Sequence, residues 1–408
     1  MNNWRVRVGW LVALSILLMA LPMAAGCAGG APAGAEIRIG VMGGQTGPAA
    51  PSVVALLEEL EHVFNYVNEV EGGIDGAKLS WRIVDNKGTP EGAVIAYKEL
   101  KGGFNPLFYI AVEGYYYLGV KNELAEDQTA MFTLSAIDPR GYLPPSVFFS
   151  VSLPISDGFA GFAKWVLDDW KGAGQPKIGV LYWEDVPTGA MWQMAQAWVM
   201  KQGVELEPVG YSIRTLDLKP QLMRLRDAEV DYIWMLSLTQ NAALAVRDFL
   251  GLGMGGKIPF CFNEFVEPDV LLDLVGEAAE GFYSYRCESP YADGAEAAEL
   301  YTKILKWATD EEKRSDHRLT ITLKAVITAA IKQAVADVGW DNLDSGAFYN
   351  ALDKLSDVDT WGNAKNFSFG PDKRAGVSAI KMGRYTKTER VTVGDWIDLP
   401  RTFEGKAE

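Results

Sequence analysis

Short apolar runs alternate along this chain with stretches of helical periodicity. Residues 79–84, 177–182 and 232–236 are runs of this kind, rich in branched and aromatic side chains. Their length and composition predict strands buried on both faces, as in a parallel sheet. Between the runs, apolar residues recur on one helical face, for example within 53–67 and 323–338. The alternation of strand and helix predicts an α/β fold with helices on both faces of parallel sheets.

Length and charge restrict the classes of function. A chain of 408 residues favours two or three domains, and 49% hydrophobic with 22% charged residues is typical of a globular protein. The formal net charge of −15 argues against nucleic-acid binding, which needs a basic face. The only histidines are His62 and His317, and no G-x-S-x-G motif is present, so a histidine metal site or a serine triad is poorly supported.

The N-terminal segment has the pattern of an export signal. Two arginines precede an almost wholly apolar stretch at 8–25, so residues 1–26 are predicted to be a signal peptide. The small residues before Cys27 resemble a bacterial lipobox, which predicts lipidation of Cys27 and a flexible tether over 27–35. Two alternatives remain open, namely cleavage at the Ala-Gly-Ala sequence 33–35 and a retained membrane anchor.

A glycine-rich loop follows the first predicted strand of the mature chain. The strand at 37–42 leads into 43–47, and a helical pattern starts after Ser52. Free N–H groups at a helix N-terminus favour an anion. The spacing matches neither a P-loop nor a dinucleotide fingerprint, and no lysine follows. The loop is therefore suited either to close approach of a ligand or to an ordinary turn with Ser52 as N-cap.

Several short motifs occur in the order found in one known family. They are the Gln-Thr-Gly-Pro sequence at 45–48, the Gly-Gly-Ile-Asp-Gly turn at 72–76, the helix-to-strand segment at 217–233 and the Gly-Glu-Ala-Ala-Glu-Gly sequence at 276–281. Over roughly residues 36–385, the chain resembles the type I periplasmic binding proteins of ABC importers. The resemblance is to the branched-chain amino-acid and amide-binding group.

The resemblance implies two Rossmann-like α/β lobes, with parallel sheets, joined by three hinge strands. The ligand would lie between the lobes, where the strands of open α/β sheets end. We expect lobe 1 to comprise 36–152 with 286–360, and lobe 2 to comprise 153–285 with 361–408.

The resemblance also implies a set of ligand-binding positions. Relatives place Ser or Thr in the loop of Gly114, Tyr115 and Tyr116, where they bind a carboxylate. Glu264 stands where amino-acid binders hold an acid against the ligand ammonium, although a surface acid is the alternative. The full expected set is Gln45, Thr46, Gly114, Tyr115, Tyr116, Ser135, Ala136, Ile137, Thr188, Ser237 and Glu264.

The implied function is capture of a small amino acid or amide-like solute for delivery to the permease subunits of an ABC transporter. The protein would be lipid-anchored in the periplasm or at the outer face of the cell membrane, without enzymatic activity, cofactor, metal or nucleic-acid partner. A ligand-sensing receptor component with the same fold is the alternative. Cys261 and Cys287 are candidates for a disulfide in an exported protein.

Overall fold

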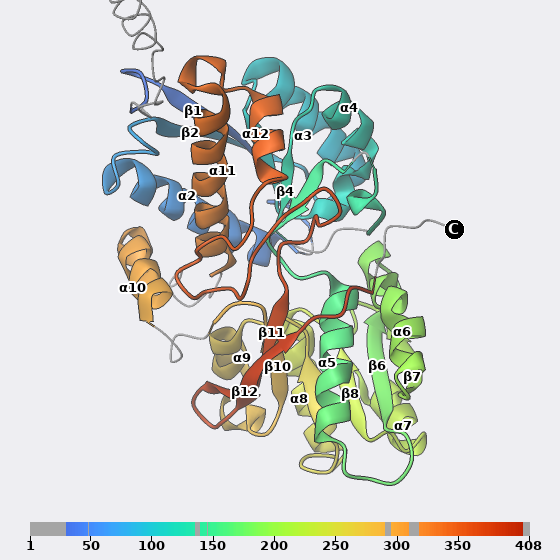
Figure 1. Cartoon of the computed structure of the whole chain (residues 1–408). Coiled ribbons are helices and arrows are strands. Elements are labelled where there is room, and N and C mark those ends of the chain that lie inside the picture. The colour runs from blue at the N-terminus through green and yellow to red at the C-terminus, as the bar shows by residue number, and fades with distance from the viewer. Residues whose placement is uncertain are drawn as a thin grey trace, which may run out of the picture.

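The computed structural model places two sheets one after the other along the molecule (Figure 1). It describes residues 30–47, 49–134, 139–144, 146–289, 295–309 and 318–402. Both sheets are covered by helices, and the predicted α/β class with two Rossmann-like lobes is confirmed.

The first sheet has five strands in the order β2-β1-β3-β4-β5, and all neighbours are parallel. Its strands are β1 (Glu36–Gly43), β2 (Lys78–Asp85), β3 (Phe108–Ala111), β4 (Met131–Thr133) and β5 (Phe148–Ser150). The strands β3, β4 and β5 are buried along their whole length, as continuous apolar runs predict for a parallel sheet. Their carboxyl ends therefore meet along one edge of the sheet.

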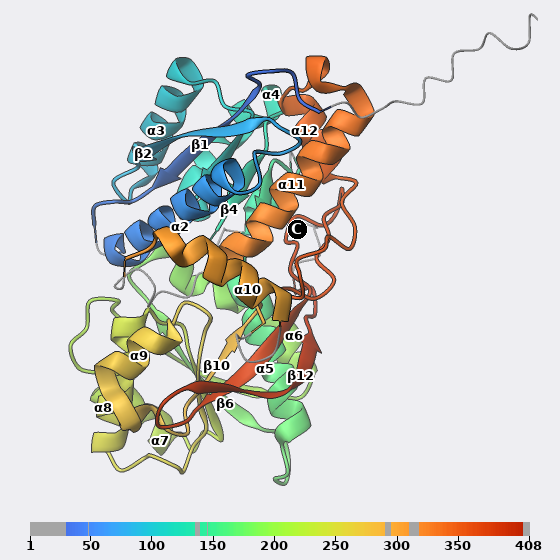
Figure 2. The same cartoon turned by 90° about the vertical axis from the view of Figure 1, so that its left-hand side faces the viewer.

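Helices from two distant parts of the chain cover the first sheet (Figures 1 and 2). They are α2 (Ala50–Glu69), α3 (Pro90–Gly103), α4 (Lys121–Glu126), α11 (Leu319–Val338) and α12 (Ser345–Leu352). Phe348 of α12 stacks on Phe108 of β3 with ring centroids 4.5 Å apart. The sheet thus buries its apolar face against helices that the chain supplies some 200 residues later in the sequence.

The helix α11 is the one helix in the described residues that is long and apolar enough to cross a membrane. It has 20 residues and a mean hydropathy of 1.4, but 67% of that stretch is buried inside the molecule. Thr320 of α11 and Tyr301 of α10 (Ala295–Ile304) both donate hydrogen bonds to the buried carboxylate of Glu59 on α2, at 2.5 and 2.8 Å. These contacts are those of a core helix in a globular lobe.

The second sheet has seven strands in the order β12-β11-β10-β9-β8-β6-β7. Its strands are β6 (Lys177–Trp183), β7 (Glu205–Tyr211), β8 (Tyr232–Met235), β9 (Phe260–Phe262), β10 (Tyr283–Arg286), β11 (Ala379–Tyr385) and β12 (Arg390–Asp398). The first five are parallel, whereas β11 runs antiparallel to both β10 and β12. The sheet therefore departs from the expected all-parallel pattern at one edge, because a hairpin needs only a short turn where a parallel strand needs a long crossover.

The second sheet is covered by α5 (Ile155–Asp169), α6 (Gln196–Lys201), α7 (Lys219–Asp227), α8 (Thr239–Gly251) and α9 (Pro268–Val275). The helix α5 buries the face that carries Phe159, whose ring lies 4.9 Å from that of Trp234 on β8. Of the residues that recur at helical spacing after β6, Met191 and Ala195 are buried, whereas Met194 and Trp198 are only half-buried. All but Trp198 belong, however, to the 3-10 helix Pro187–Ala195, which continues into α6.

The chain passes between the two sheets after β5, after β10 and again before β11. The first and last of these crossings are hydrogen-bonded to each other, since Ser150 exchanges backbone bonds with Arg374 and Gly376 at 2.8 and 3.0 Å. Phe369 packs on Phe149 of β5 with ring centroids 5.1 Å apart. This contact favours a last crossing after Phe369. The expected crossing, between residues 360 and 361, lies earlier in the chain. The bounds of the lobes stay a prediction.

Candidate functional site

A cavity of about 160 Å³ lies between the two sheets and is lined from both sides. Val53 and Leu56 of α2 and Val112 after β3 form the wall on the side of the first sheet. Trp183 at the end of β6 and Leu238 after β8 form the opposite wall. These side chains follow the carboxyl ends of parallel strands, where open α/β sheets place their ligands. The cavity therefore suits a small solute with an apolar body.

Glu264 supplies a buried carboxyl group at the wall formed by the second sheet. It follows β9, lines the cavity and has only 7% of its surface exposed. Neither of its carboxyl oxygens has a hydrogen-bond partner of good geometry, although the Tyr285 hydroxyl acts as a donor that lowers its pKa. Burial, together with the charge of Glu288, raises the pKa of Glu264 to about 8, while Arg286 acts in the opposite direction. A buried acid without a partner is costly unless a ligand completes it.

Glu113 lies at the wall formed by the first sheet, directly after β3 and Val112. Its two oxygens accept the backbone N–H of Gly44 at 3.2 and 3.0 Å, and one also accepts Asn86 Nδ2 at 3.3 Å. A Cβ at Gly44 would come within 2.6 Å of Glu113 Oε1, so the glycine is what allows this close approach. Burial raises the pKa of Glu113, while the two donors lower it. The N–H group of Gly44 in the glycine loop thus donates to a carboxylate of the protein itself.

The next residues of the glycine loop are bound by a second acid. Gln45 donates its backbone N–H to Asp85 Oδ1 at 2.9 Å, and Thr46 Oγ1 donates to Asp85 Oδ2 at 3.4 Å. Lys87 N–H also donates to Asp85 Oδ1, at 2.8 Å. The helix α2 begins at Ala50 with Ala49 as its N-cap, so the expected N-cap role of Ser52 is wrong.

Arg286 is the basic side chain among the residues that line the cavity. Its Nη2 donates to Glu267 Oε2 at 3.0 Å and to the carbonyl of Val266 at 3.3 Å. Both charged side chains are largely buried, so the pair fixes the loop after β9 against β10. Glu288, two residues after Arg286, also lines the cavity and is 7% exposed.

A second cavity of about 350 Å³ continues the cleft toward solvent. Tyr115 and Tyr116 line it from the side of the first sheet, with ring centroids 4.2 Å apart. Asp185 and Arg214 line it from the other side. Tyr115 borders both cavities, whereas Tyr116 lines only the second.

The structure brings together part of the expected ligand-binding set. Five of the expected residues line one or both cavities, namely Thr46, Tyr115, Tyr116, Thr188 and Glu264. Gln45, Gly114 and Ser237 lie in the adjoining loops without lining either cavity. Ser135, Ala136 and Ile137 lie outside the described residues. The binding roles of the whole set stay predictions.

Several residues of the site were missed by the sequence analysis. Glu113 and Trp183 directly follow buried apolar runs, so the rule that ligands meet the carboxyl ends of strands could have found them. Arg286 ends β10, Glu288 lies on the crossing just after it, and Leu319 starts a helix far along the chain. No local pattern in the sequence marks these three as neighbours of a cleft.

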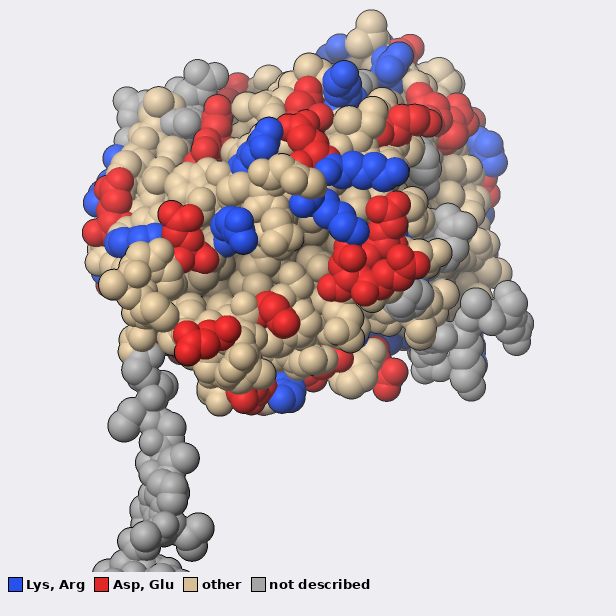
Figure 3. All heavy atoms as spheres, turned by 90° about the horizontal axis from the view of Figure 1, so that it is seen from above, with Lys and Arg blue, Asp and Glu red and all other residues tan. Residues whose placement is uncertain are grey.

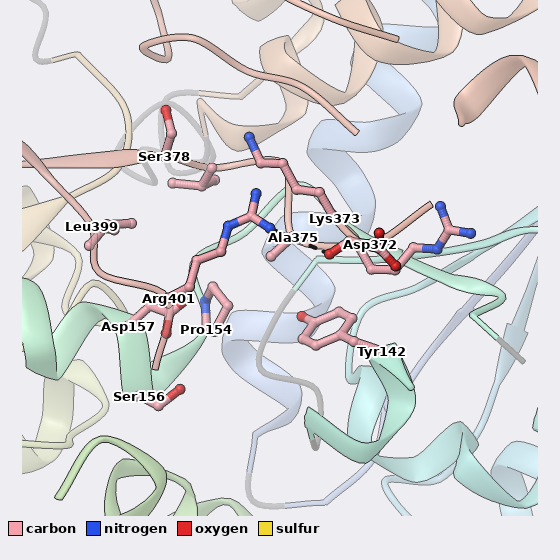
Figure 4. Close-up of a pocket in the computed structure, with 12 residues that line it drawn as sticks. Tyr142, Pro154, Ser156, Asp157, Asp372, Lys373, Ala375, Ser378, Leu399 and Arg401 are labelled. Carbon is pink, nitrogen blue, oxygen red and sulfur yellow. Dashed lines mark hydrogen bonds between the residues drawn. The ribbon is translucent and has the colours of Figure 1, made fainter. Parts of the chain in front are cut away.

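A further cavity, of about 140 Å³, lies where the first and last crossings meet the C-terminal segment (Figure 4). The basic ends of Lys373 and Arg401 lie on the same side of it. Burial lowers the pKa of Lys373, and the charge of Arg401 lowers it further. Asp157 at the start of α5 accepts both N–H and Oγ1 of Thr402, at 3.2 and 2.6 Å. This cavity belongs to the hinge, and its polar contacts tie the C-terminal segment to α5.

Other expected features were a disulfide and the absence of metal. Cys261 and Cys287 are both free, buried thiols, and burial raises the pKa of each. Within the part of the chain that the structure describes, no group of three or more His, Cys, Asp or Glu side chains is arranged to hold a metal ion.

Figure 3 shows acidic side chains interspersed with basic ones on the face seen from above.

Comparison with solved structures gives close matches in fold. A branched-chain amino-acid ABC transporter protein from Thermus thermophilus with bound valine has a TM-score of 0.79 at 16% identity, covering 90% of this chain and 97% of that one. A leucine-binding protein from Thermotoga maritima has a TM-score of 0.72 at 15% identity, covering 89% and 99%. A fatty-acid ABC transporter substrate-binding protein from Thermomonospora curvata has a TM-score of 0.74 at 19% identity, covering 89% and 92%. The fold is therefore shared by proteins whose described ligands differ in chemistry.

Comparison of the sequence with protein families gives a match over most of the chain. No curated protein sequence is similar enough to match. The model of the family described as periplasmic binding protein matches residues 36–389. This is a family of binding proteins, so the protein is not an enzyme, and the resemblance found in the sequence motifs is confirmed. The chain belongs to the periplasmic binding protein family.

Proposed function

We propose that this protein captures a small amino acid or amide-like solute outside the cytoplasm and delivers it to the permease subunits of an ABC importer. The observation that carries the proposal is the cavity between the two sheets, lined from both sides and containing the unpartnered carboxyl group of Glu264. A ligand nitrogen that donates to Glu264 would remove the cost of burying this group without a partner. The family supports the extracytoplasmic location and the role in ABC transport.

Binding in the cleft would couple the ligand to the relative position of the lobes. Val53 and Val112 contribute to one wall, and Trp183 and Leu238 to the other. A solute that touches both walls is bound best when the lobes are close together. The energy for closure must come from contacts that exist only in the closed state. We infer that Thr46, Tyr115, Tyr116, Thr188 and Glu264 contact the bound solute.

The solute can be identified by native mass spectrometry of protein purified from its own organism. We expect one small molecule per chain, containing an amine or amide nitrogen, and we expect unfolding to release it. Recovery of a solute without nitrogen would exclude the proposed ligand class. Conversion of the released solute during incubation with the protein would contradict a role in binding alone.

We further propose that a lipid on Cys27 attaches the protein to the outer face of the membrane. Cys27 lies outside the described residues, while the end of the proposed tether contacts the first lobe through Ala31 N–H and the carbonyl of Asp75 at 2.8 Å. A tether fixed at this point would leave the cleft free to open. Intact mass spectrometry of the exported protein should give a chain that starts at a diacylated Cys27. An unmodified chain that starts at Glu36 would support simple secretion instead.

A further inference from the structure

The glycine loop after β1 has no vacancy for an anion at its first two N–H groups. Gly44 N–H donates to Glu113 at 3.0 Å, and Gln45 N–H donates to Asp85 at 2.9 Å. The sequence suggested that this loop could receive the carboxylate of a ligand. In the structure, carboxylates of the protein occupy these donors, so a carboxylate of the solute would have to displace them.

The lining of the main cavity is acidic. Four glutamates line it, and its one basic side chain, Arg286, donates to one of them, Glu267. The remaining three are Glu113, Glu264 and Glu288, each with less than a tenth of its surface exposed. Glu113 lies on the side of the first lobe, Glu264 lies on the side of the second, and Glu288 lies on the crossing after β10. Acids thus border the cavity on both sides.

The unpartnered carboxyl group of Glu264 is a second, independent sign of the ligand. It is buried, lines the cavity, and neither oxygen has a hydrogen-bond partner of good geometry. A bound ammonium group would supply both a positive charge and N–H donors. An anionic group at the same place would face the charge of Glu288 and would oppose the ionisation of Glu264.

The N-terminus of α2 favours a negatively charged group on the ligand. Ala49 and Ser52 at this end line the cavity, and the first turn contains no acid. A helix N-terminus is equivalent to about half a positive charge. Three buried carboxyl groups border the same cavity, and those that are ionised repel an anion.

We propose that the solute of this cleft is a small cation with an apolar body and without a carboxylate, such as an aliphatic amine or an amino-acid amide. This inference rests on the proposed solute-binding function and narrows its ligand class. The ammonium group would bind between the acids that border the cavity, and the apolar body would pack on Val53, Leu56 and Trp183. A free amino acid would fit the apolar walls but would place its carboxylate against Glu113.

Four probes that share one branched alkyl group test the inference by calorimetry on the mature protein. They are 3-methylbutylamine, leucinamide, leucine and 4-methylpentanoate, so that ammonium and carboxylate groups are varied separately. We expect the amine and the amide to bind at least about tenfold more tightly than leucine. We expect 4-methylpentanoate to show no binding. Tighter binding of leucine or of 4-methylpentanoate than of the amine would overturn the inference.

The variant Glu113→Gln tests the role assigned to the acid of the first lobe. It retains the shape of the side chain and removes its charge, so leucine should gain on 3-methylbutylamine by at least about fivefold in relative affinity. Glu205→Gln is the matched control, because Glu205 is exposed at the far end of β7 and lines neither cavity. An unchanged ratio in Glu113→Gln would contradict the inference. If this variant does not fold, the four probes on the unmodified protein decide.

The solute that co-purifies with the protein separates this inference from the proposed function. A solute that bears a carboxylate would overturn the inference and leave the function standing. An amine or amide without a carboxylate would support both. If no solute is recovered and none of the four probes binds, the proposed function fails and the inference fails with it.

Discussion

The protonation of Glu264 makes the free energy of unfolding of the ligand-free protein depend on pH. Its pKa is raised from the usual 4.5 to about 8, with burial as the main cause. Between these two values the folded protein retains a proton that the unfolded chain has released. The free energy of unfolding of the ligand-free protein therefore contains a contribution from Glu264 that is present below about pH 4.5 and is lost as the pH rises to about 8.

Glu264→Gln should therefore stabilise the ligand-free protein at alkaline pH. We expect its free energy of unfolding to exceed that of the unmodified protein by about 1–3 kcal/mol near pH 9, because the variant has no buried charge to form. Near pH 4.5 the two should differ little. Urea denaturation at both pH values measures this difference, with Glu205→Gln as the exposed control. A difference that is equal at both pH values would show that Glu264 does not titrate as described.

Binding of a cationic probe should release a proton from Glu264 near neutral pH. The charged and titratable groups that act on it are Glu288, Arg286 and Tyr285, with the thiol of Cys287 beside them. None of these supplies a net positive charge comparable to that of an ammonium ligand, since Arg286 and Glu288 oppose each other. The ammonium should lower the pKa of Glu264, so affinity should rise between about pH 6 and about pH 8.

Calorimetry with 3-methylbutylamine in two buffers of different ionisation enthalpy measures this release. Near pH 7 the two apparent binding enthalpies should differ. The difference should equal the difference between the two buffer ionisation enthalpies multiplied by the number of protons released, which is less than one per chain. Near pH 9 the difference should vanish, because Glu264 is then ionised before binding. Equal enthalpies in both buffers at pH 7 would mean that Glu264 does not pair with the amine.

At the level of single residues, the sequence predicted which loops reach the cleft better than it predicted which charged groups make contacts there. The family resemblance led to the loops of Tyr115 and Glu264, and both residues line the cavity. It did not predict that Glu113 would bind the glycine loop, because Gly44 and Glu113 are 69 residues apart and their contact depends on the pairing of β1 with β3. Interactions of this kind follow from the register of strands and have no local pattern.

The helix α3 offers a test at the level of elements, because two of its three glycines have different surroundings. A Cβ at Gly92 would lie 1.9 Å from the carbonyl oxygen of Asn86, whereas a Cβ at Gly102 would meet nothing within 4 Å. Thr89 caps this helix through its side chain and the N–H of Gly92, at 3.0 Å. The first turn of α3 is thus packed tightly on the loop that contains Asn86.

We expect Gly92→Ala to destabilise the protein by about 1–3 kcal/mol through this clash. The same substitution at Gly102 should stabilise it by about 0.5–1 kcal/mol, because alanine favours the helix. Thermal denaturation of both variants measures the contrast. Since Asn86 donates to Glu113, Gly92→Ala should also alter probe binding, whereas Gly102→Ala should not. Equal stability of the two variants would contradict the packing described at Asn86.

Periodicity predicted the elements with different success. The parallel strands and the long helices α2 and α11 lie where their apolar patterns indicated. The segment Pro187–Ala195 has helical spacing but forms a 3-10 helix, since its glycine at 189 packs directly against the backbone of Trp183. Spacing alone does not separate the two kinds of helix, because both place every third or fourth residue on one side.

For the whole molecule, the arrangement of crossings predicts a motion of one lobe against the other. The cleft lies between the sheets, and the first and last crossings are joined by the backbone bonds of Ser150. Rotation about these segments can bring the walls together without changing either core, as in hinge closure around a ligand. We therefore expect each sheet, with the helices that cover it, to move as one body.

Small-angle X-ray scattering should give a smaller radius of gyration once a tight solute is bound. Circular dichroism should change little, because each lobe keeps its secondary structure. Glu205→Gln should compact as the unmodified protein does, whereas Glu264→Gln should need a higher concentration of 3-methylbutylamine. Scattering curves that coincide with and without saturating solute would contradict closure.

The order of segments along the chain also determines when each lobe can form. The first sheet receives α11 and α12 only from residues 319–352, and the second receives β11 and β12 only from residues 379–398. During synthesis, both cores therefore lack a covering layer or an edge until almost the whole chain has been made. Contacts between such distant segments also form slowly. For the export that we propose, this order keeps both cores incomplete until nearly the whole chain is available.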